Sequence, residues 1–341
     1  MSARGTRGGP GVLVLGALAL ATACAPGSQA VQAAGQLGLG GRRATRSFLE
    51  LVPDAPFVTA FRGERLVEFF YEVDGEPRTL RYREDVGSNG EGMFAVEGIE
   101  ALEGTDNPAL FRLMHTNRAN FMYRYRDFRI RDLDRFLRNF DARIVDESRD
   151  VAGVQCSALH IERRSGATTH FEVCIDPATG LVMSWEERAQ DGALLSRVYF
   201  ETFELGGDLA GLDLVTNRYS PQPLDENDPD EELGFNLWRP TLPPTGYELD
   251  SAASFVDETG RTWAKLVYGN GADHVFFLQG EPLVADPVPV GQNTSDFLER
   301  VVVGPWTMIH GTIDDVPVIL MGKVAGGQLK DMLQSALNAR F

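Results

Sequence analysis

Residues 154–203 contain four runs in which apolar and polar side chains alternate. Short clusters of turn-forming residues separate these runs: Arg164-Ser165-Gly166, Asp176-Pro177-Ala178-Thr179-Gly180 and Gln190-Asp191-Gly192. Alternation with a period of two is typical of strands that bury one face, and such clusters are typical of tight turns. The stretch therefore predicts a four-stranded antiparallel meander, whose apolar face must be covered by another part of the chain.

The chain before the meander carries further strand signals. Residues 65–73 and 78–84 alternate on either side of Asp74-Gly75, a pair typical of hairpin turns. Strands are also predicted over 92–96, after a glycine-rich turn at 87–90, and over 142–148. Counting from Arg65, the first domain is predicted to have about nine or ten strands and one or two helices. A sheet of that size must curl, and the few helices would leave space on its concave side.

The apolar side chains expected on that concave side form the candidate ligand cavity. If the space is filled, the same side chains are simply core. They are Val67, Phe69, Tyr71, Tyr82, Tyr123, Leu159, Phe171, Val173, Met183 and Phe200.

One helix is predicted between the hairpin and the meander, in the most basic part of the chain. Leu133, Phe136, Leu137 and Phe140 recur at the spacing of an amphipathic helix. The surrounding arginines either bind anions, such as lipid phosphates or an acidic peptide, or form a solvated face that pairs with the acidic half of the chain. We favour the second interpretation. The arginines are Arg112, Arg118, Arg124, Arg126, Arg129, Arg131, Arg135 and Arg138.

A second domain follows an acidic, proline-rich stretch. Residues 218–240 have the composition of an extended linker. Beyond it, alternating runs predict a small antiparallel sheet, and apolar positions between Leu329 and Leu337 predict a helix across one of its faces. The runs cover 247–255, 261–268, 273–279, 297–303, 306–313 and 316–324. The predicted domains are therefore 44–217 and 241–341.

The first residues predict export. An apolar run from Val12 to Ala21 follows two arginines and is shorter than the ~20 residues that span a bilayer, as in a signal peptide over 1–23. Leu20-Ala21-Thr22-Ala23-Cys24 is similar to a bacterial lipobox, so that Cys24 is either lipidated or left by simple cleavage after Ala23. Residues 24–43 form a predicted flexible tether.

Two cysteines remain in the meander. With the hairpin turn centred on Ser165, Cys156 lies opposite Cys174 and His160 opposite His170, on the outer face of the sheet. An oxidising compartment then favours a Cys156–Cys174 disulfide. A Cys2His2 metal site is rejected because four residues along a strand span ~13 Å, whereas Zn–ligand bonds measure ~2.0–2.3 Å. We predict the disulfide and no metal site.

The formal net charge is −17, and it is unevenly distributed. Residues 151–341 carry 12 Lys+Arg against 28 Asp+Glu, which argues against nucleic acid and favours basic partners. The sequence has no Gly-x-Ser-x-Gly elbow, no Walker loop and no Gly-x-Gly-x-x-Gly after a strand. We therefore predict a binding protein without catalytic residues or cofactor, with an undetected hydrolase as the alternative.

Several short motifs follow one another in a particular order along both domains. They are Gly153-Val154-Gln155-Cys156, His170–Ile175, Asp176–Leu181, Glu186, Leu242-Pro243, Gly246–Leu249, Leu266–Gly271 and Gly311–Gly322. Their order and spacing resemble those of the MucB/RseB proteins, which are periplasmic regulators of the envelope-stress sigma-factor pathway. The resemblance covers about residues 45–341, and residues 65–84 match it loosely.

This resemblance implies a mainly β (α+β) fold. The first domain would be a LolA-like curled antiparallel half-barrel with few helices, and the second a small antiparallel sheet with one helix. It also implies an apolar cavity for acyl chains of lipid or lipoprotein, and binding to the periplasmic part of a membrane anti-sigma factor until lipid or misplaced lipoprotein displaces it. The alternative is a LolA/LolB-like carrier or receptor of such cargo without a regulatory role. Both place the protein in the periplasm, and a lipobox would tether it to a membrane through Cys24.

Overall fold

The computed structural model describes residues 48–73, 75–106, 126–164, 169–214, 222–225, 229–257, 259–282 and 297–339. The predicted signal peptide, Cys24, the tether and Tyr123 lie outside the described residues, as do Arg112, Arg118 and Arg124. No helix within the described ranges combines the length and apolar character needed to cross a membrane.

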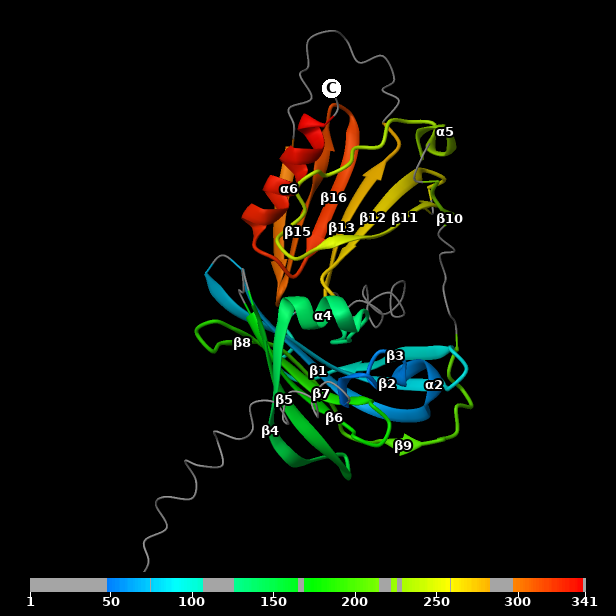
Figure 1. Cartoon of the computed structure of the whole chain (residues 1–341), viewed down its shortest axis with the longest axis vertical. Coiled ribbons are helices and arrows are strands. Elements are labelled where there is room, and N and C mark those ends of the chain that lie inside the picture. Colours follow the sequence, from blue (N-terminus) through cyan, green and yellow to red (C-terminus); the bar gives the residue numbers. More distant parts are fainter. Residues whose placement is uncertain are drawn as a thin grey trace, which may run out of the picture. The chain divides into compact units, whose positions relative to one another are not determined.

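The first sheet contains nine antiparallel strands (Figure 1). Their order is β3-β2-β1-β8-β7-β6-β5-β4, and β9 pairs with β1. The strands are β1 (Ala60–Val73), β2 (Glu76–Asn89), β3 (Phe94–Ala101), β4 (Phe140–Val151), β5 (Val154–Arg163), β6 (Thr169–Ile175), β7 (Val182–Ala189), β8 (Leu194–Phe200) and β9 (Glu204–Leu205). The predicted meander is β5 to β8, and the predicted hairpin β1–β2 joins it through β8. The sheet is open, with β3 and β4 at its edges. Strands far outnumber helices among the described elements, and the predicted mainly β fold is confirmed.

The helices α2 (Ala55–Val58) and α4 (Leu133–Asn139) precede the meander. Asp132 caps α4 because its side chain accepts a hydrogen bond from the backbone N–H of Arg135 at 2.8 Å. Asp134 in the first turn and Arg138 in the last turn complement the helix dipole. The predicted apolar stripe is confirmed for three of its residues, since Phe136 is fully buried and Leu133 and Leu137 pack against the same core. The fourth, Phe140, is buried in that core too but begins β4.

The register between β5 and β6 differs from the prediction by two residues. Cys174 lies opposite Ala158 rather than Cys156, and His170 lies opposite Glu162 rather than His160. The predicted pairs are therefore diagonal neighbours that share a face. Cys156 and Cys174 form a disulfide across this diagonal, with their Cα atoms 5.6 Å apart. Both cysteines are buried on the outer face, where Val151, Ala152 and Val154 pack against their cluster.

Reducing the Cys156–Cys174 disulfide is expected to lower the free energy of unfolding by about 3 kcal/mol. The bond joins residues 18 apart in sequence, and a loop of this length carries about that much chain entropy in the unfolded state. Urea unfolding with and without reductant measures the change. The same reductant added to a Cys156→Ala/Cys174→Ala double variant should have no effect. An unchanged midpoint for the wild-type protein would contradict this expectation.

The second sheet contains seven antiparallel strands in the order β10-β11-β12-β13-β16-β15-β14. They are β10 (Gln222–Pro223), β11 (Glu248–Val256), β12 (Thr262–Gly269), β13 (His274–Gly280), β14 (Phe297–Val303), β15 (Trp306–Ile313) and β16 (Val316–Gly322). The closing helix α6 (Gly326–Asn338) lies along β15 and β16 (Figure 1). Its apolar residues Leu329, Met332 and Leu333 are buried against Phe277 and Leu320 of the sheet.

The stretch predicted as an extended linker, 218–240, carries structure of its own. Its described residues include β10, which pairs with β11, and a short helix α5 (Pro229–Leu233). Leu224, Leu233 and Phe235 form a buried cluster with Ala264 of β12. The stretch thus supplies four apolar anchors, the fourth being Trp238 in the core of the second sheet.

Candidate functional site

The predicted cavity residues lie in a packed core. Val67, Phe69, Tyr82, Leu159, Phe171 and Val173 belong to one buried cluster, and the half-buried Tyr71 packs against it. Met183 and Phe200 belong to a second buried cluster, which contains the disulfide. We call the face of the first sheet that carries Leu159, Phe171 and Val173 the inner face, and the opposite face the outer face.

Aromatic residues of α4 and next to it pack on the inner face. The ring centroid of Phe128 lies 5.2 Å from that of Phe171 and 6.5 Å from that of Phe136. Phe136 stacks in turn on Phe140 at 4.9 Å. A cavity bordered by Phe128 and Phe200 has a volume of about 40 Å³. That volume holds water molecules, whereas pockets for drug-sized ligands measure ~300–1,000 Å³.

A buried charge cluster lies beside this small cavity. It consists of Arg65, Glu84, Arg126 and Asp127, each less than 7% exposed. Arg126 donates to both carboxylate oxygens of Glu84, at 2.7 and 2.9 Å, and to Asp127 at 2.7 Å. Arg65 pairs with Glu84 and with Asp127, the latter at 2.8 Å. Two cations and two anions thus neutralise one another within the core of the first domain.

Tyr82, one of the predicted cavity residues, is part of the same arrangement. Its hydroxyl accepts a hydrogen bond from Arg126 at 2.8 Å. Burial raises the pKa of Tyr82 well above its usual value, so the phenol stays neutral. Burial alone would lower the pKa of Arg126, but Asp127 and Glu84 raise it well above the ordinary value and keep the guanidinium charged. A charged, fully paired cluster at this place is a feature of a structural core rather than of a lipid cavity.

The described arginines of the basic segment follow the favoured interpretation, in which they pair within the chain. Arg135 of α4 pairs with Asp250 of β11, and Arg138 lies 3.4 Å from Glu248. Arg131 donates to the carbonyl of Ala272 at 3.3 Å. These side chains therefore bind acidic and carbonyl groups of the second domain, and the anion-binding interpretation has no support from them.

A second buried ion cluster joins β7 to the second domain. Nζ of Lys323 lies 2.9 Å from Glu187 and 3.4 Å from Asp273. Glu187 is fully buried, and burial raises the pKa of its carboxyl to about 7, although Lys323 lowers it in part. The same carboxylates raise the pKa of Lys323, against the effect of its own burial.

The outer face of the first sheet carries an open, polar groove of about 530 Å³. We call it the polar groove, and its lining includes Arg149, Asp150, Glu172, Glu186, Arg197 and Tyr199. Arg197 donates to Glu68 at 2.7 Å, and Arg188 donates to Glu186 at 3.0 Å. Burial alone would lower the pKa of Arg197, but Glu68 raises it above the usual value. The groove has the size of a ligand site, and its lining suits charged or hydrogen-bonding groups rather than acyl chains.

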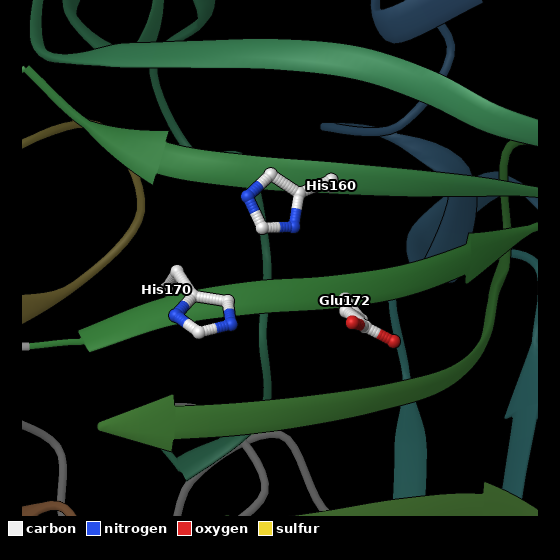
Figure 2. A group of neighbouring side chains, drawn as sticks. All are labelled: His160, His170 and Glu172. Atoms are coloured by element: carbon white, nitrogen blue, oxygen red, sulfur yellow. The ribbon is translucent and has the colours of Figure 1, made fainter. Parts of the chain in front are cut away.

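Next to the polar groove, two histidines and a glutamate converge (Figure 2). Nitrogen and oxygen atoms of His160, His170 and Glu172 all lie within 4.8 Å of one another. The sequence prediction of no metal site considered only the two cysteines as additional ligands and overlooked Glu172. The rejected Cys2His2 site stays rejected because both sulfurs are held in the disulfide.

No model of a known protein family matches the chain, and no curated protein does. Among solved structures it is similar to MucB in complex with MucA(peri), with 19% identity, 85% of this chain and 97% of that chain covered, and a TM-score of 0.47. It is also similar to a chain of the Pseudomonas aeruginosa MucA/MucB complex, with 18% identity, 86% and 97% covered, and a TM-score of 0.48.

A third similar structure is that of MucB alone, with 20% identity, 87% and 98% covered, and a TM-score of 0.46. The predicted resemblance to MucB/RseB proteins is thereby confirmed as a similarity to solved MucB structures.

Proposed function

We propose that this protein is an exported envelope-stress regulator that binds the periplasmic part of a membrane anti-sigma factor. The observation that carries the proposal is the ordered set of MucB/RseB-like motifs, from Gly153-Val154-Gln155-Cys156 in the first sheet to Gly311–Gly322 in the second. These motifs coincide with structural elements: Asp176–Leu181 forms the β6–β7 turn, and Leu266–Gly271 ends β12 and leads towards β13. One set of motifs thus spans both sheets.

The charge of the chain supports a partner with basic residues. Residues 151–341 carry 12 basic against 28 acidic residues, and the described arginines of α4 already pair within the chain. The excess of carboxylates is therefore available to attract a basic segment, and such attraction mainly speeds association and falls with ionic strength.

The test is titration of the purified protein with the periplasmic segment of the anti-sigma factor from the same organism, followed by calorimetry. We expect a 1:1 complex with a Kd of about 1 μM or tighter, weakening about tenfold or more between 50 and 500 mM salt. A scrambled segment of the same composition is the matched control. Equal binding of both segments, or of neither, would rule out the proposed partner.

The finer part of the proposal is that lipid or lipoprotein releases the partner. Because Phe128 packs on Phe171 of the inner face and Phe136 packs on Phe128, an acyl chain entering there would have to displace Phe128. A diacylated lipopeptide added to the complex should then release the segment, and the same peptide without acyl chains should not. Release by neither would limit the protein to partner binding. Stoichiometric lipid in an organic extract, together with no partner binding, would instead indicate a lipid or lipoprotein carrier.

A further inference from the structure

The group formed by His160, His170 and Glu172 has the donor set of a transition-metal site. Imidazole nitrogen suits Zn²⁺ and its neighbours, and two imidazoles with one carboxylate form a common three-ligand set that leaves a coordination position open. All three side chains are half-buried, and the His160 side chain is 16% exposed. They are therefore shielded in part from water yet remain accessible to an ion.

The strand register produces this group. His160 on β5 lies directly opposite Glu172 on β6, so their Cβ atoms are neighbours across the ladder. His170 lies two residues before Glu172 and points to the same face, diagonal to His160. The ring centroids of the two histidines are 5.0 Å apart, and Figure 2 shows both rings beside the Glu172 carboxylate.

The spacing is close to what an ion requires. Bonds of ~2.1 Å at tetrahedral angles place ligand atoms about 3.4 Å apart. The three atoms already lie within 4.8 Å of one another, so side-chain rotations without backbone movement can close the difference. All three residues lie on paired strands rather than on loops, which fixes their Cβ positions.

A neighbouring carboxylate orients the His160 ring. Nε2 of His160 lies 2.8 Å from Oε1 of Glu162, the next outward-facing residue on β5. Glu162 lies directly opposite His170 on β6, so its carboxylate adjoins both histidines. With Nε2–H donating to Glu162, the lone pair of the His160 ring lies on Nδ1. Glu162 and Glu172 supply two negative charges, and Arg143 and Arg188, which lie opposite His160 and His170 on the neighbouring strands, supply two positive charges.

We propose that His160, His170 and Glu172 bind one divalent transition-metal ion, with Zn²⁺ as the reference ion. Because Glu172 also lines the polar groove, the proposed site borders that groove. The site joins β5 and β6 on the outer face, close to the disulfide that joins the same two strands. It is independent of the proposed anti-sigma partner.

The test uses the full exported chain, without a histidine tag and stripped with chelator, titrated with Zn²⁺ against a chromophoric chelator. We expect one site with a Kd of about 10 μM or tighter, no binding of Ca²⁺, and a rise in Tm with Zn²⁺. His170→Gln and Glu172→Gln should each weaken binding at least tenfold. X-ray absorption of the Zn²⁺ complex should show two imidazole ligands.

The matched control is His310→Gln, because His310 is a partly exposed histidine that lies 3.6 Å from a carboxylate, Glu299, in the second sheet. This variant should bind Zn²⁺ as the wild-type protein does. Equal losses in His170→Gln and His310→Gln would overturn the proposal, as would no binding by the wild-type chain. A Tm without metal that matches the wild-type value shows that each variant folds, so that a loss of affinity reports on the site.

Discussion

Replacing Glu84 with leucine is expected to lower the free energy of unfolding by about 3–5 kcal/mol, because it leaves a buried cation without its partner. Glu84 is fully buried and contacts two guanidinium groups, those of Arg65 and Arg126. Only Asp127 would remain to balance them. A net positive charge would then be buried beside Trp185 and Phe200, whose rings lie 5.8 and 5.7 Å from the Arg65 guanidinium.

Urea unfolding followed by tryptophan fluorescence measures this loss. The control is Glu100→Leu on β3, because Glu100 pairs with Arg83 while its side chain is 51% exposed. An exposed pair contributes about 0–1 kcal/mol. Removing Arg126 as well, in a Glu84→Leu/Arg126→Met variant, should recover part of the loss, since Arg65 and Asp127 then balance each other. Equal costs for Glu84→Leu and Glu100→Leu would mean that water reaches the cluster.

The sequence could have pointed to part of this cluster. The apolar residues Val67 on β1 and Tyr82 on β2 face inward. The same alternation places Arg65, two residues before Val67, and Glu84, two residues after Tyr82, inward as well. The structure pairs Arg65 and Glu84 directly across the ladder. An opposite charge pair at facing inward positions predicts a buried salt bridge. Arg126 and Asp127 could not be placed from the sequence, because the alternation over residues 121–126 suits a strand, whereas these two residues lie outside any strand of the structure.

Several strands were predictable because they bury one face more than the other, as the alternating burial along β2, β7, β8, β15 and β16 shows. The predicted runs over 297–303 and 306–313 coincide with β14 and β15, and the meander strands agree with β5 to β8. Pairing was harder, as β5 and β6 show. A shift of two residues leaves every side chain on its original face, so alternation cannot detect it, and only the geometry of the turn decides.

The same limit explains why the metal-binding group was missed. The register predicted from the sequence places His170 opposite His160 and offers only the two cysteines as further ligands. With the observed register, Glu172 takes that place and becomes the third ligand. Outward alternation on β6 could have indicated Glu172 as a neighbour of His170, but the match to His160 depends on the register.

Replacing Lys323 with methionine is expected to cost about 3–5 kcal/mol of unfolding free energy near pH 8. The Lys323 ammonium contacts two carboxylates, the fully buried Glu187 and the largely buried Asp273. Without it, two like charges face each other inside the protein. The exposed Lys330 of α6 provides the control, and Lys330→Met should change stability by less than about 0.5 kcal/mol.

The loss in Lys323→Met should depend on pH with a definite sign. Burial raises the pKa of Glu187 from 4.5 to about 7 in the folded protein. The folded state therefore holds a proton that the unfolded state has released, and this carboxyl makes stability fall as pH rises from about 4.5 to 7. Glu187→Gln should remove that contribution. Because Lys323 lowers the pKa of Glu187, Lys323→Met should raise that pKa further and extend the fall above pH 7.

Unfolding free energies at pH 5, 6, 7 and 8 for the wild-type protein and both variants separate these effects. The difference in unfolding free energy between the wild-type protein and Lys323→Met should be smallest at pH 5, where Glu187 is protonated and only Asp273 lacks its cation. Asp250 does not mimic this pattern, since its two partners, His274 and Arg135, lower its pKa and its contribution is lost only in more acidic solution. A loss in Lys323→Met that is constant from pH 5 to 8 would show that Glu187 is ionised throughout, and that its ion pair with Lys323 outweighs its burial.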